Sequence, residues 1–345
     1  MQPAIASRLQ DSVATAGIAL GGAPLGNLFR PVAEEEARAV LDRAWDAGIR
    51  CFDTAPHYGH GLSERRFGAA LRGRPRDAYL LSTKVGRLLH ADARAPAAQH
   101  GYVDVPRYVQ SYDYSRAGVL RSLDESRERL GVDRIDVVYV HDLDRATHGD
   151  RFEAHFRMLL DEGLPALAEL KRAGDIAAYG IGVNGVDISL QTLRHADLDV
   201  ILLAGRYTLA DQSALPELLP ECERRDVAIV LGGPFNSGIL ATGAHPADGG
   251  HAYFDYAPAP PGVVARVEAV EAVCGAHGVS LAAAALQFPA AHPAVAAVLA
   301  GARNVAELAA NLAFARAPIP AEFWVELRTR GLVPAGAPLP GLPPW

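Results

Sequence analysis

Four side chains of the types that move protons lie at or just after the ends of short apolar runs. Asp53 closes the run IRCFD, and Lys84 and His141 close LLSTK and IDVVYVH in the same way. Tyr58 follows Asp53 by five residues, in a Gly-rich turn before a helix-like segment. A free phenol has a pKa near 10, and a nearby ammonium lowers that pKa by favouring the phenolate. Together the four residues predict a site that couples proton transfer to redox chemistry, as in a reductase or dehydrogenase.

Each of the four residues has a separate expected role. Lys84 supplies the positive charge beside the phenol, and Asp53 holds the lysine and limits the cost of its burial. Tyr58 donates or accepts the proton, and His141 hydrogen-bonds the substrate oxygen and orients it. A solvated lysine or a tyrosine covering apolar surface is the ordinary interpretation of either residue alone. Their joint placement after neighbouring strands favours the catalytic interpretation.

Eight short apolar runs alternate with helix-like segments, which predicts parallel strands joined by right-handed crossovers. The expected strands cover residues 17–22, 49–53, 79–84, 135–140, 177–183, 200–204, 227–232 and 295–300. The expected helices cover residues 34–47, 63–72, 116–130, 160–173, 188–196, 212–225, 263–277 and 304–315. Eight such units favour an α/β fold of the (β/α)8 TIM barrel type, with its active site at the carboxyl ends of the strands. A doubly wound open sheet is disfavoured because no G-x-G-x-x-G follows an early strand.

We expect a single domain over residues 1–345, with the barrel core at about 16–316 and a C-terminal helix and Pro-rich tail at 317–345. Residues 86–114 and 234–262 interrupt the alternation and are expected to form long active-site loops without regular structure. The tail contains five prolines after residue 330 and ends in Trp345, so we expect it on the surface or at a subunit contact.

Composition narrows the class of protein. The chain of 345 residues is 50% hydrophobic and 21% charged, as in a globular enzyme. Its net charge of -7 argues against nucleic-acid binding, and no apolar run approaches the roughly 20 residues that span a bilayer. The N-terminus lacks a basic segment followed by an apolar one, so we expect no secretion signal and a cytoplasmic location. Cys51, Cys222 and Cys274 match no disulfide or zinc spacing and are expected to be buried and reduced. We expect a monomer or homodimer with a small-molecule substrate.

Three segments resemble the aldo-keto reductases. The run GIRCFDTAPHYGHGLSERRFG resembles the first signature of that family, and STKVGR and YVHDLD are similar to the segments that carry its lysine and histidine. The resemblance extends from about residue 16 to residue 316. It implies that Asp53, Tyr58, Lys84 and His141 form the catalytic tetrad. It also implies that the chain binds a nicotinamide dinucleotide without a Gly-rich dinucleotide fold.

The resemblance further implies where the cofactor binds. Asn184 resembles the residue that holds the nicotinamide carboxamide, and GGPFNSGIL (232–240) resembles the pyrophosphate loop, although a plain turn is an equal alternative. In that loop the backbone N–H groups of Phe235, Asn236 and Gly238 are the candidates. The last strand and helix (299–315) resemble the element that holds the adenosine end. The expected cofactor-binding residues are Gly22, Ala23, Asp53, Asn184, Gly233, Pro234, Phe235, Asn236, Gly238, Leu240, Gly301, Ala302, Arg303, Glu307 and Asn311.

Departures from the NADPH-binding pattern favour NAD. Gly301 and Ala302 stand where relatives place a Lys-Ser pair, and Glu307 stands where they place an arginine. A carboxylate repels the 2′-phosphate and accepts a ribose hydroxyl. Arg303 is close enough in sequence to reach a phosphate, so NADP stays the less favoured alternative. Ala204 and Gly232 replace the usual glutamine and nicotinamide-stacking tyrosine, which puts the usual nicotinamide packing in doubt.

LAGRYTLADQ, HDLDRATHGD and GGAPLGNLFR are most similar to the branch of the family that oxidises aldoses or pyridoxal. This similarity implies NAD-dependent oxidation of an L-fucose, L-galactose or D-arabinose type of aldose at C1 to the lactone, with Tyr58 as the base. Oxidation of pyridoxal to 4-pyridoxolactone, NADPH-dependent aldehyde reduction and a cofactor-sensing regulatory subunit are the alternatives. The expected substrate-binding residues are Phe29, His57, Tyr58, His141 and Arg206.

The segment HDLDRATHGD also has the residue types of a metal site. Its candidate ligands are His141, Asp142, Asp144, His148 and Asp150. Their spacing matches no known zinc or calcium loop, so we expect a polar loop with one catalytic histidine and no metal.

Overall fold

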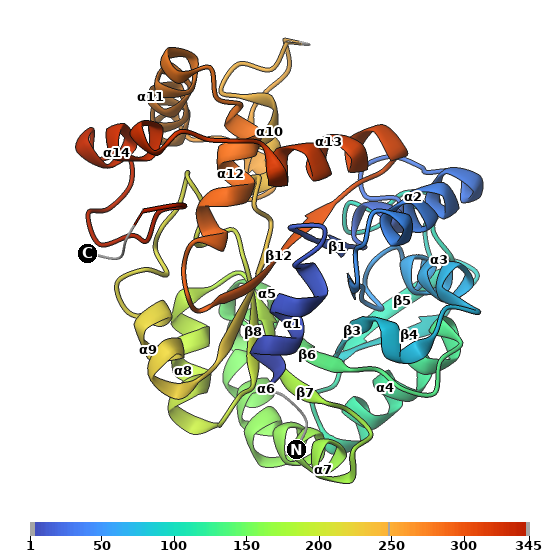
Figure 1. The fold of residues 1–345 in the computed structure, drawn as a ribbon. Helices are drawn as coiled ribbons and strands as arrows, with labels where there is room; N and C mark the ends of the chain where they lie inside the picture. Colours follow the sequence, from blue (N-terminus) through green and yellow to red (C-terminus); the bar gives the residue numbers. More distant parts are fainter. Residues whose placement is uncertain (1–3, 248, 343–345) are drawn as a thin grey trace.

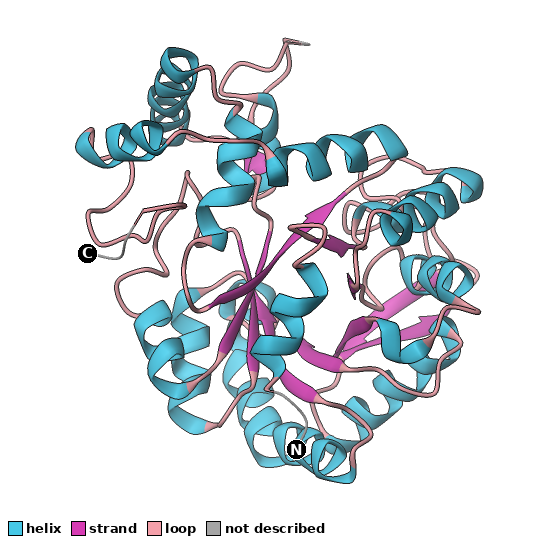
Figure 2. Cartoon of the chain, in the orientation of Figure 1, coloured by secondary structure: helices cyan, strands magenta, loops and turns pink. Residues whose placement is uncertain are grey.

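A closed barrel of parallel strands forms the centre of the molecule (Figures 1 and 2). The structure, a computed structural model, describes residues 4–247 and 249–342. Around the barrel the strands run in the order β1-β12-β9-β8-β7-β6-β3-β2, and β2 pairs with β1 to close it. Their bounds are Ala19–Gly21 (β1), Cys51–Asp53 (β2), Leu80–Val85 (β3), Val137–His141 (β6), Ala178–Val183 (β7), Val200–Ala204 (β8), Ala228–Gly232 (β9) and Val295–Gly301 (β12). Every expected strand is present, and the predicted TIM barrel is confirmed.

A ring of helices covers the outside of the barrel (Figure 2, cyan). The helices that follow the eight strands are Glu34–Asp46 (α2), Leu62–Leu71 (α3), Arg116–Leu130 (α4), Leu164–Ala173 (α7), Val186–His195 (α8), Leu218–Arg225 (α9), Leu281–Ala290 (α12) and Val305–Arg316 (α13). In α4, apolar residues at helical spacing place one face of the helix on the sheet, so that Val119, Leu123 and Leu130 are buried. Shorter helices in the loops are Pro24–Gly26 (η1), Arg76–Ala78 (η2), Arg145–His148 (α5), Gly149–Arg151 (η3), Phe152–Met158 (α6) and Leu159–Gly163 (η4).

The seventh helix of the ring differs from the expectation. The predicted segment 263–277 is helical as Pro261–His277 (α11), but it packs beside Ala321–Thr329 (α14), away from the barrel axis (Figure 1). Helix α12, which the sequence analysis missed, packs against β12 instead. Because α12 is buried on most sides, its run LAAAALQFPA has no polar face and shows no amphipathic period.

Both expected long loops are present and contain short elements of regular structure. Within residues 86–114, Arg87–Ala91 (β4) pairs antiparallel with Tyr108–Tyr112 (β5). The 16 residues between these strands hide the pairing, because a hairpin is recognised from a short turn. Residues 234–262 contain Asn236–Gly238 (η5), Ile239–Thr242 (α10) and the two-residue pair Tyr253–Phe254 (β10) and Ala257–Pro258 (β11).

The N-terminal helix Ile5–Val13 (α1) lies across the base of the barrel (Figure 1, dark blue). Its Leu9 is buried with the lowest layer of barrel side chains, among them Cys51 and Val137. At the other terminus, Phe323 and Trp324 of α14 are buried, as is Leu339 in the tail. Trp345 lies outside the described residues.

Within the described residues, no single helix is long and apolar enough to cross a membrane. The bent pair α11 and α12 meets that criterion by length and composition only.

Candidate active site

The barrel brings Asp53, Lys84 and Tyr58 together at the carboxyl ends of β2 and β3. Asp53 and Lys84 are 2% and 1% exposed. Lys84 Nζ donates to Asp53 Oδ2 at 2.7 Å and to the carbonyl of Thr54 at 2.9 Å, and Ser82 Oγ donates to Asp53 Oδ1 at 2.7 Å. The same Nζ lies 4.6 Å from the centroid of the Tyr58 ring. The structure therefore places a buried ion pair directly beside the phenol.

The pKa of Tyr58 differs from the expectation. Burial raises this pKa well above its usual value of 10.0, and the Asp53 carboxylate raises it further. Both hydrogen bonds of the Lys84 ammonium go to oxygens of Asp53 and Thr54, so its charge is largely balanced by its own partner. The expected lowering of the Tyr58 pKa is wrong, and the phenol holds its proton at neutral pH.

His141 ends β6 and packs against Tyr58. The two ring centroids are 5.9 Å apart and the ring planes are nearly perpendicular, at 86°. Burial, helped by the charges of Arg87 and Lys84, lowers the pKa of His141 well below 6.5, so the imidazole is neutral at pH 7. Its Nδ1 is buried and has no hydrogen-bond partner in the described part of the chain. A neutral imidazole in this position can donate one hydrogen bond to a substrate oxygen.

The β4–β5 hairpin supplies functional groups that the sequence analysis missed. Arg87 on β4 is 7% exposed, and its guanidinium pairs with the carboxylate of Asp142. Arg87 Nη1 also lies 3.3 Å from His57 Nδ1 and donates to Gln110 Oε1 at 3.2 Å. The available signals were an arginine three residues after Lys84 and an aspartate directly after His141. Neither residue could be assigned a role from the sequence, because the hairpin that brings residues 87 and 110 together was not predicted.

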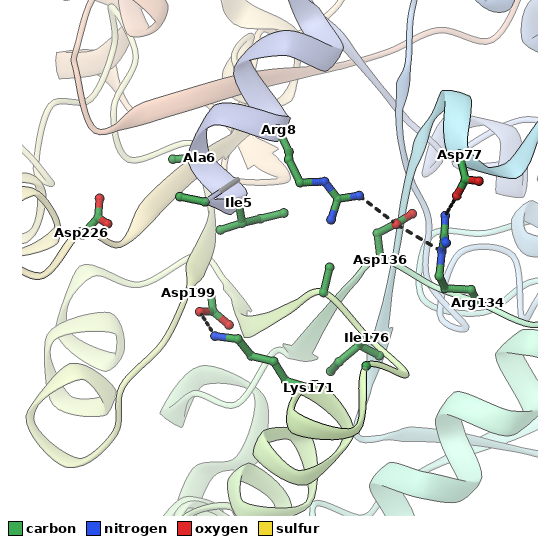
Figure 3. Close-up of a pocket in the computed structure, with 13 residues that line it drawn as sticks. Ile5, Ala6, Arg8, Asp77, Arg134, Asp136, Lys171, Ile176, Asp199 and Asp226 are labelled. Atoms are coloured by element: carbon green, nitrogen blue, oxygen red, sulfur yellow. Dashed lines mark hydrogen bonds and ion pairs between the residues drawn. The ribbon is translucent and has the colours of Figure 1, made fainter. Parts of the chain in front are cut away.

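A cavity of about 400 Å³ opens beside these groups. Its lining consists of the carboxyl-end loops and strand ends, namely Ala23, Leu28, Phe29, His57, Tyr58, Lys84, His100, Gly101, Tyr102, His141, Asp142, Gly182, Val183, Asn184, Leu202, Ala204 and Tyr256. A larger cavity of about 710 Å³ lies at the opposite end, between α1 and the amino ends of the strands (Figure 3). The four expected catalytic residues lie at the smaller cavity.

Several expected nicotinamide-site residues lie at this cavity. Asn184 follows β7, and its side-chain amide has no hydrogen-bond partner among the described residues, which fits a site for another amide. Ala23 lines the cavity as well. Gly22 is explained by packing, because a Cβ there would lie 2.6 Å from Ser63 Oγ. A Cβ at Gly232 would lie 3.2 Å from Leu202, which lines the cavity and covers the place of the missing tyrosine.

The loop 232–240 forms tight turns after β9, as the plain-turn alternative predicts. The amides of Asn236 and Gly238 donate to the carbonyls of Gly233 and Phe235 at 2.9 and 3.0 Å. Two of the three backbone amides that were expected to bind the cofactor therefore donate within the turn instead. Of the expected three, this leaves the amide of Phe235.

Four side chains of this loop face the protein interior. Pro234, Ile239 and Leu240 are buried, and Asn236 Nδ2 donates to the carbonyl of Gly205 at 2.9 Å. These residues position the loop against the neighbouring turn after β8. Any contact that they make with a cofactor is limited to the backbone.

At the expected adenosine end, Glu307 is shared between two arginines. Arg303 donates to its carboxylate through the backbone N–H at 2.9 Å and through Nε at 3.1 Å, and Arg30 lies at 3.1 Å. Burial opposes the charge of Glu307, but the Arg303 hydrogen bonds and the charges of Arg303 and Arg30 together lower its pKa. Asn304 Oδ1 accepts the Glu307 N–H, so the backbone of Glu307 belongs to the N-terminal cap of α13.

The other residues of this end are held inside the fold. Ala302 is fully buried, and Asn311 Nδ2 donates to the carbonyl of Gly301 at 3.0 Å. A Cβ at Gly301 would lie 2.6 Å from Pro24, so glycine is required for close packing of η1 on β12.

Of the expected substrate-binding residues, Phe29, His57, Tyr58 and His141 line the cavity, whereas Arg206 is absent from its lining. Arg206 donates to the carbonyl of Asn184 at 2.7 Å and pairs with Asp211 and Asp255 at 3.1 and 2.8 Å. Direct contact of Arg206 with the substrate stays a prediction. Its ion pairs hold the tip of the β10–β11 hairpin, which carries Tyr256 to the cavity. The sequence analysis missed Tyr256.

His148 and the three cysteines lie outside the cavity and pack within the protein. His148 lies against Tyr114, whose hydroxyl is 2.9 Å from His148 Nε2. Among the described residues, no group of three or more His, Cys, Asp or Glu side chains is placed to hold a metal ion. Cys51, Cys222 and Cys274 are free and buried.

Comparisons with known proteins agree with this geometry. Residues 17–329 match the model of the aldo/keto reductase family. The chain is 44% identical to pyridoxal 4-dehydrogenase of Microbacterium luteolum, over 92% of this chain and 94% of that protein. It is 41% identical to D-threo-aldose 1-dehydrogenase of a Pseudomonas species, over 95% and 99%. An aldo-keto reductase structure from Bacillus halodurans superposes with a TM-score of 0.69 at 26% identity, covering 92% of each chain. The protein belongs to the aldo-keto reductase family and is an oxidoreductase that works with a nicotinamide cofactor.

Proposed function

We propose that the protein oxidises an aldose of the L-fucose, L-galactose or D-arabinose type at C1 to the lactone, with NAD as the cofactor. The observation that carries this proposal is the buried Asp53–Lys84 pair beside Tyr58, with the neutral ring of His141 against the same phenol. The 41% identity to an aldose 1-dehydrogenase supports the substrate class.

The proposed oxidation removes one hydride and one proton from the anomeric centre. The C1–H electron pair and its hydrogen leave together as hydride, and the hydroxyl proton goes to Tyr58 Oη, so that a C=O bond forms. Bound NAD supplies the hydride acceptor. His141 orients the reacting oxygen. Tyr58 accepts the proton in its ionised form, and the ammonium of Lys84 beside the ring favours that phenolate before the proton arrives.

The residues present fit a nicotinamide cofactor. Asn184 offers an unpaired amide at the cavity, and Leu202 offers an apolar surface where Gly232 lacks a side chain. At the adenosine end we propose NAD because Glu307 places a carboxylate beside the ribose position. Arg30 and Arg303 partly neutralise that carboxylate, which keeps NADP as the less favoured alternative.

Pyridoxal oxidation is a second candidate function, favoured by the 44% identity to pyridoxal 4-dehydrogenase. The hemiacetal form of pyridoxal gives 4-pyridoxolactone by the same loss of hydride and proton. The aromatic side chains of Phe29, Tyr102 and Tyr256 at the cavity suit a planar ring as well as the C–H face of a sugar.

One screen separates these candidates. NADH or NADPH formation is measured with L-fucose, L-galactose, D-arabinose and pyridoxal, each with NAD and with NADP. Turnover of an aldose with NAD supports the first candidate, and turnover of pyridoxal alone supports the second. Efficient reduction of aldehydes with NADPH and no oxidation of either substrate class contradicts both.

The variant Tyr58→Phe tests the mechanism. We expect it to lose at least about 10³-fold in kcat while it still binds NADH, because only the proton carrier is removed. Tyr253→Phe is the matched control, since Tyr253 is 46% exposed on β10 and lies outside the cavity lining. Unchanged turnover in Tyr58→Phe contradicts the mechanism, and NADH binding without turnover in the wild type supports a regulatory protein.

A further inference from the structure

Asp142 places a carboxylate in the cavity next to the proposed reaction centre. Its side chain is 20% exposed, it lines the cavity, and its Oδ2 lies 3.4 Å from His141 Nε2. The residue has a φ of 47°, a backbone conformation that residues other than glycine rarely adopt. Its N–H donates to the carbonyl of Gly182 at 3.0 Å, which holds this turn after β6 against β7.

Arg87 makes this carboxylate suitable for a neutral ligand. The guanidinium is nearly buried and pairs with Asp142 from the side of the hairpin. A carboxylate whose charge is balanced in this way attracts a cation less but still accepts a hydrogen bond from a hydroxyl.

The guanidinium of Arg87 determines which ring nitrogen of His57 carries the proton. Arg87 Nη1 lies 3.3 Å from His57 Nδ1, and a guanidinium has donors only, so Nδ1 is the acceptor. Both the oxygen and the nitrogen of the Gln110 amide lie 3.0 Å from the same Nδ1. Because Arg87 Nη1 already donates to that oxygen at 3.2 Å, the Gln110 nitrogen is the atom that can donate to Nδ1. Burial, then the charge of Arg87, lowers the pKa of His57 well below 6.5, so its single proton is on Nε2. That Nε2 has no hydrogen-bond partner among the described residues, and the ring lines the cavity.

We propose that Asp142 and His57 form a subsite that binds the C2 and C3 hydroxyls of the substrate, beyond the reacting C1. Asp142 accepts a hydrogen bond from one hydroxyl, His57 Nε2–H donates to the other, and Arg87 with Gln110 positions both groups. This inference rests on the proposed aldose oxidation. Neighbouring hydroxyls on a neutral ring match one acceptor and one donor in a charge-balanced site, whereas pyridoxal carries one ring hydroxyl beside its reacting carbon and no neighbouring pair of ring hydroxyls.

Substrates that lack one hydroxyl provide the test. For the best aldose and its 2-deoxy and 3-deoxy analogues, kcat and KM are measured for wild type, Asp142→Asn and His57→Leu. We expect each variant to lose about 10- to 100-fold in kcat/KM on the aldose and less than about threefold on the analogue that lacks its own hydroxyl partner. His57→Gln, which keeps a donor near the position of Nε2, is expected to recover part of the loss.

Folding and general damage are controlled separately. NADH binding and the unfolding midpoint are measured for every variant, and Asp197→Asn and His195→Gln are matched controls at exposed positions. Equal losses on the aldose and on both analogues overturn the subsite while leaving aldose oxidation intact. Absence of aldose turnover in the wild type overturns both proposals.

Discussion

The two ends of the barrel hold similar charges in different arrangements. We call the carboxyl ends of the barrel strands the mouth and their amino ends the base. Asp53 at the mouth and Asp136 at the base are both almost fully buried carboxylates beside cations. The base has the larger cavity, about 710 Å³ against about 400 Å³ (Figure 3). Cavity size alone therefore does not identify the reactive end.

At the base, oppositely charged side chains pair with one another. Asp136 accepts from the N–H of Leu81 at 2.9 Å and pairs with Arg8, Arg76 and Arg134. This carboxylate joins α1 and the segments before β3 and β6, so its role is to hold the barrel base together (Figure 3).

At the mouth, polar atoms are left for a ligand. Nδ1 of His141, the amide of Asn184 and Nε2 of His57 lack hydrogen-bond partners within the described residues. Because Asn184 and His57 also line the cavity beside Tyr58 and Lys84, these unpaired groups support the assignment of this end as the functional one.

The largest expected effect is at the mouth. Lys84→Met removes the charge beside Tyr58, and we expect kcat to fall by about 10²- to 10⁴-fold. Arg8→Met at the base removes a cation from Asp136 and is expected to keep kcat within about twofold. Steady-state NADH formation, with NADH binding as a check on folding, measures both. An equal loss of kcat in the two variants contradicts the assignment of the two ends.

The base is expected to respond in stability. Asp136→Asn leaves three arginines without their shared carboxylate, and we expect a loss of roughly 2–4 kcal/mol in the free energy of unfolding, discounted because those arginines are partly exposed. Urea unfolding measures the loss, and kcat of the folded fraction is expected to stay near wild type. An unchanged free energy of unfolding contradicts the role of Asp136 in holding the barrel base together.

The pH dependence of oxidation reports the raised pKa of Tyr58. Because the phenol holds its proton at neutral pH, we expect kcat/KM for oxidation to rise by roughly tenfold per pH unit between about pH 7 and 9. The reductive direction, which uses the protonated phenol, is expected to be flat over that range. A plateau of the oxidation profile at neutral pH contradicts the raised pKa.

The smallest expected effect is on cofactor choice. Glu307→Ala releases Arg30 and Arg303, which are 54% and 38% exposed, so we expect the ratio of kcat/KM for NADP over NAD to rise by about three- to tenfold. The gain is expected to shrink at high salt, because exposed charges are screened. Glu322→Ala on the exposed side of α14 is the control, and an unchanged ratio in Glu307→Ala contradicts a role for this carboxylate.

The strands were predictable because each is a short apolar run ended by a polar residue or glycine. Asp53, Lys84 and His141 could be placed together because parallel strands in a barrel end at one rim. Helix α12 was not predictable by its pattern, since burial on most sides removed its polar face.

The direction of a side chain that depends on partners far away in the chain could not be predicted from the sequence. Arg206 turns from the cavity because Asp211 and Asp255 hold it, and Arg87 enters the site because a hairpin with a long connection brings it there. The Tyr58 pKa was mispredicted because its shift depends first on the complete burial of the phenol and then on the nearby Asp53 carboxylate, and neither can be measured from the sequence.

Arg206 also couples three loops that surround the cavity. One guanidinium joins the carbonyl of Asn184 after β7, Asp211 after β8 and Asp255 in the hairpin after β9. The hairpin therefore cannot swing outward without breaking an ion pair whose acidic partner is 44% exposed. Because salt screens an exposed ion pair, we expect the hold of Arg206 on this hairpin, and with it the position of Tyr256 over the cavity, to weaken as ionic strength rises.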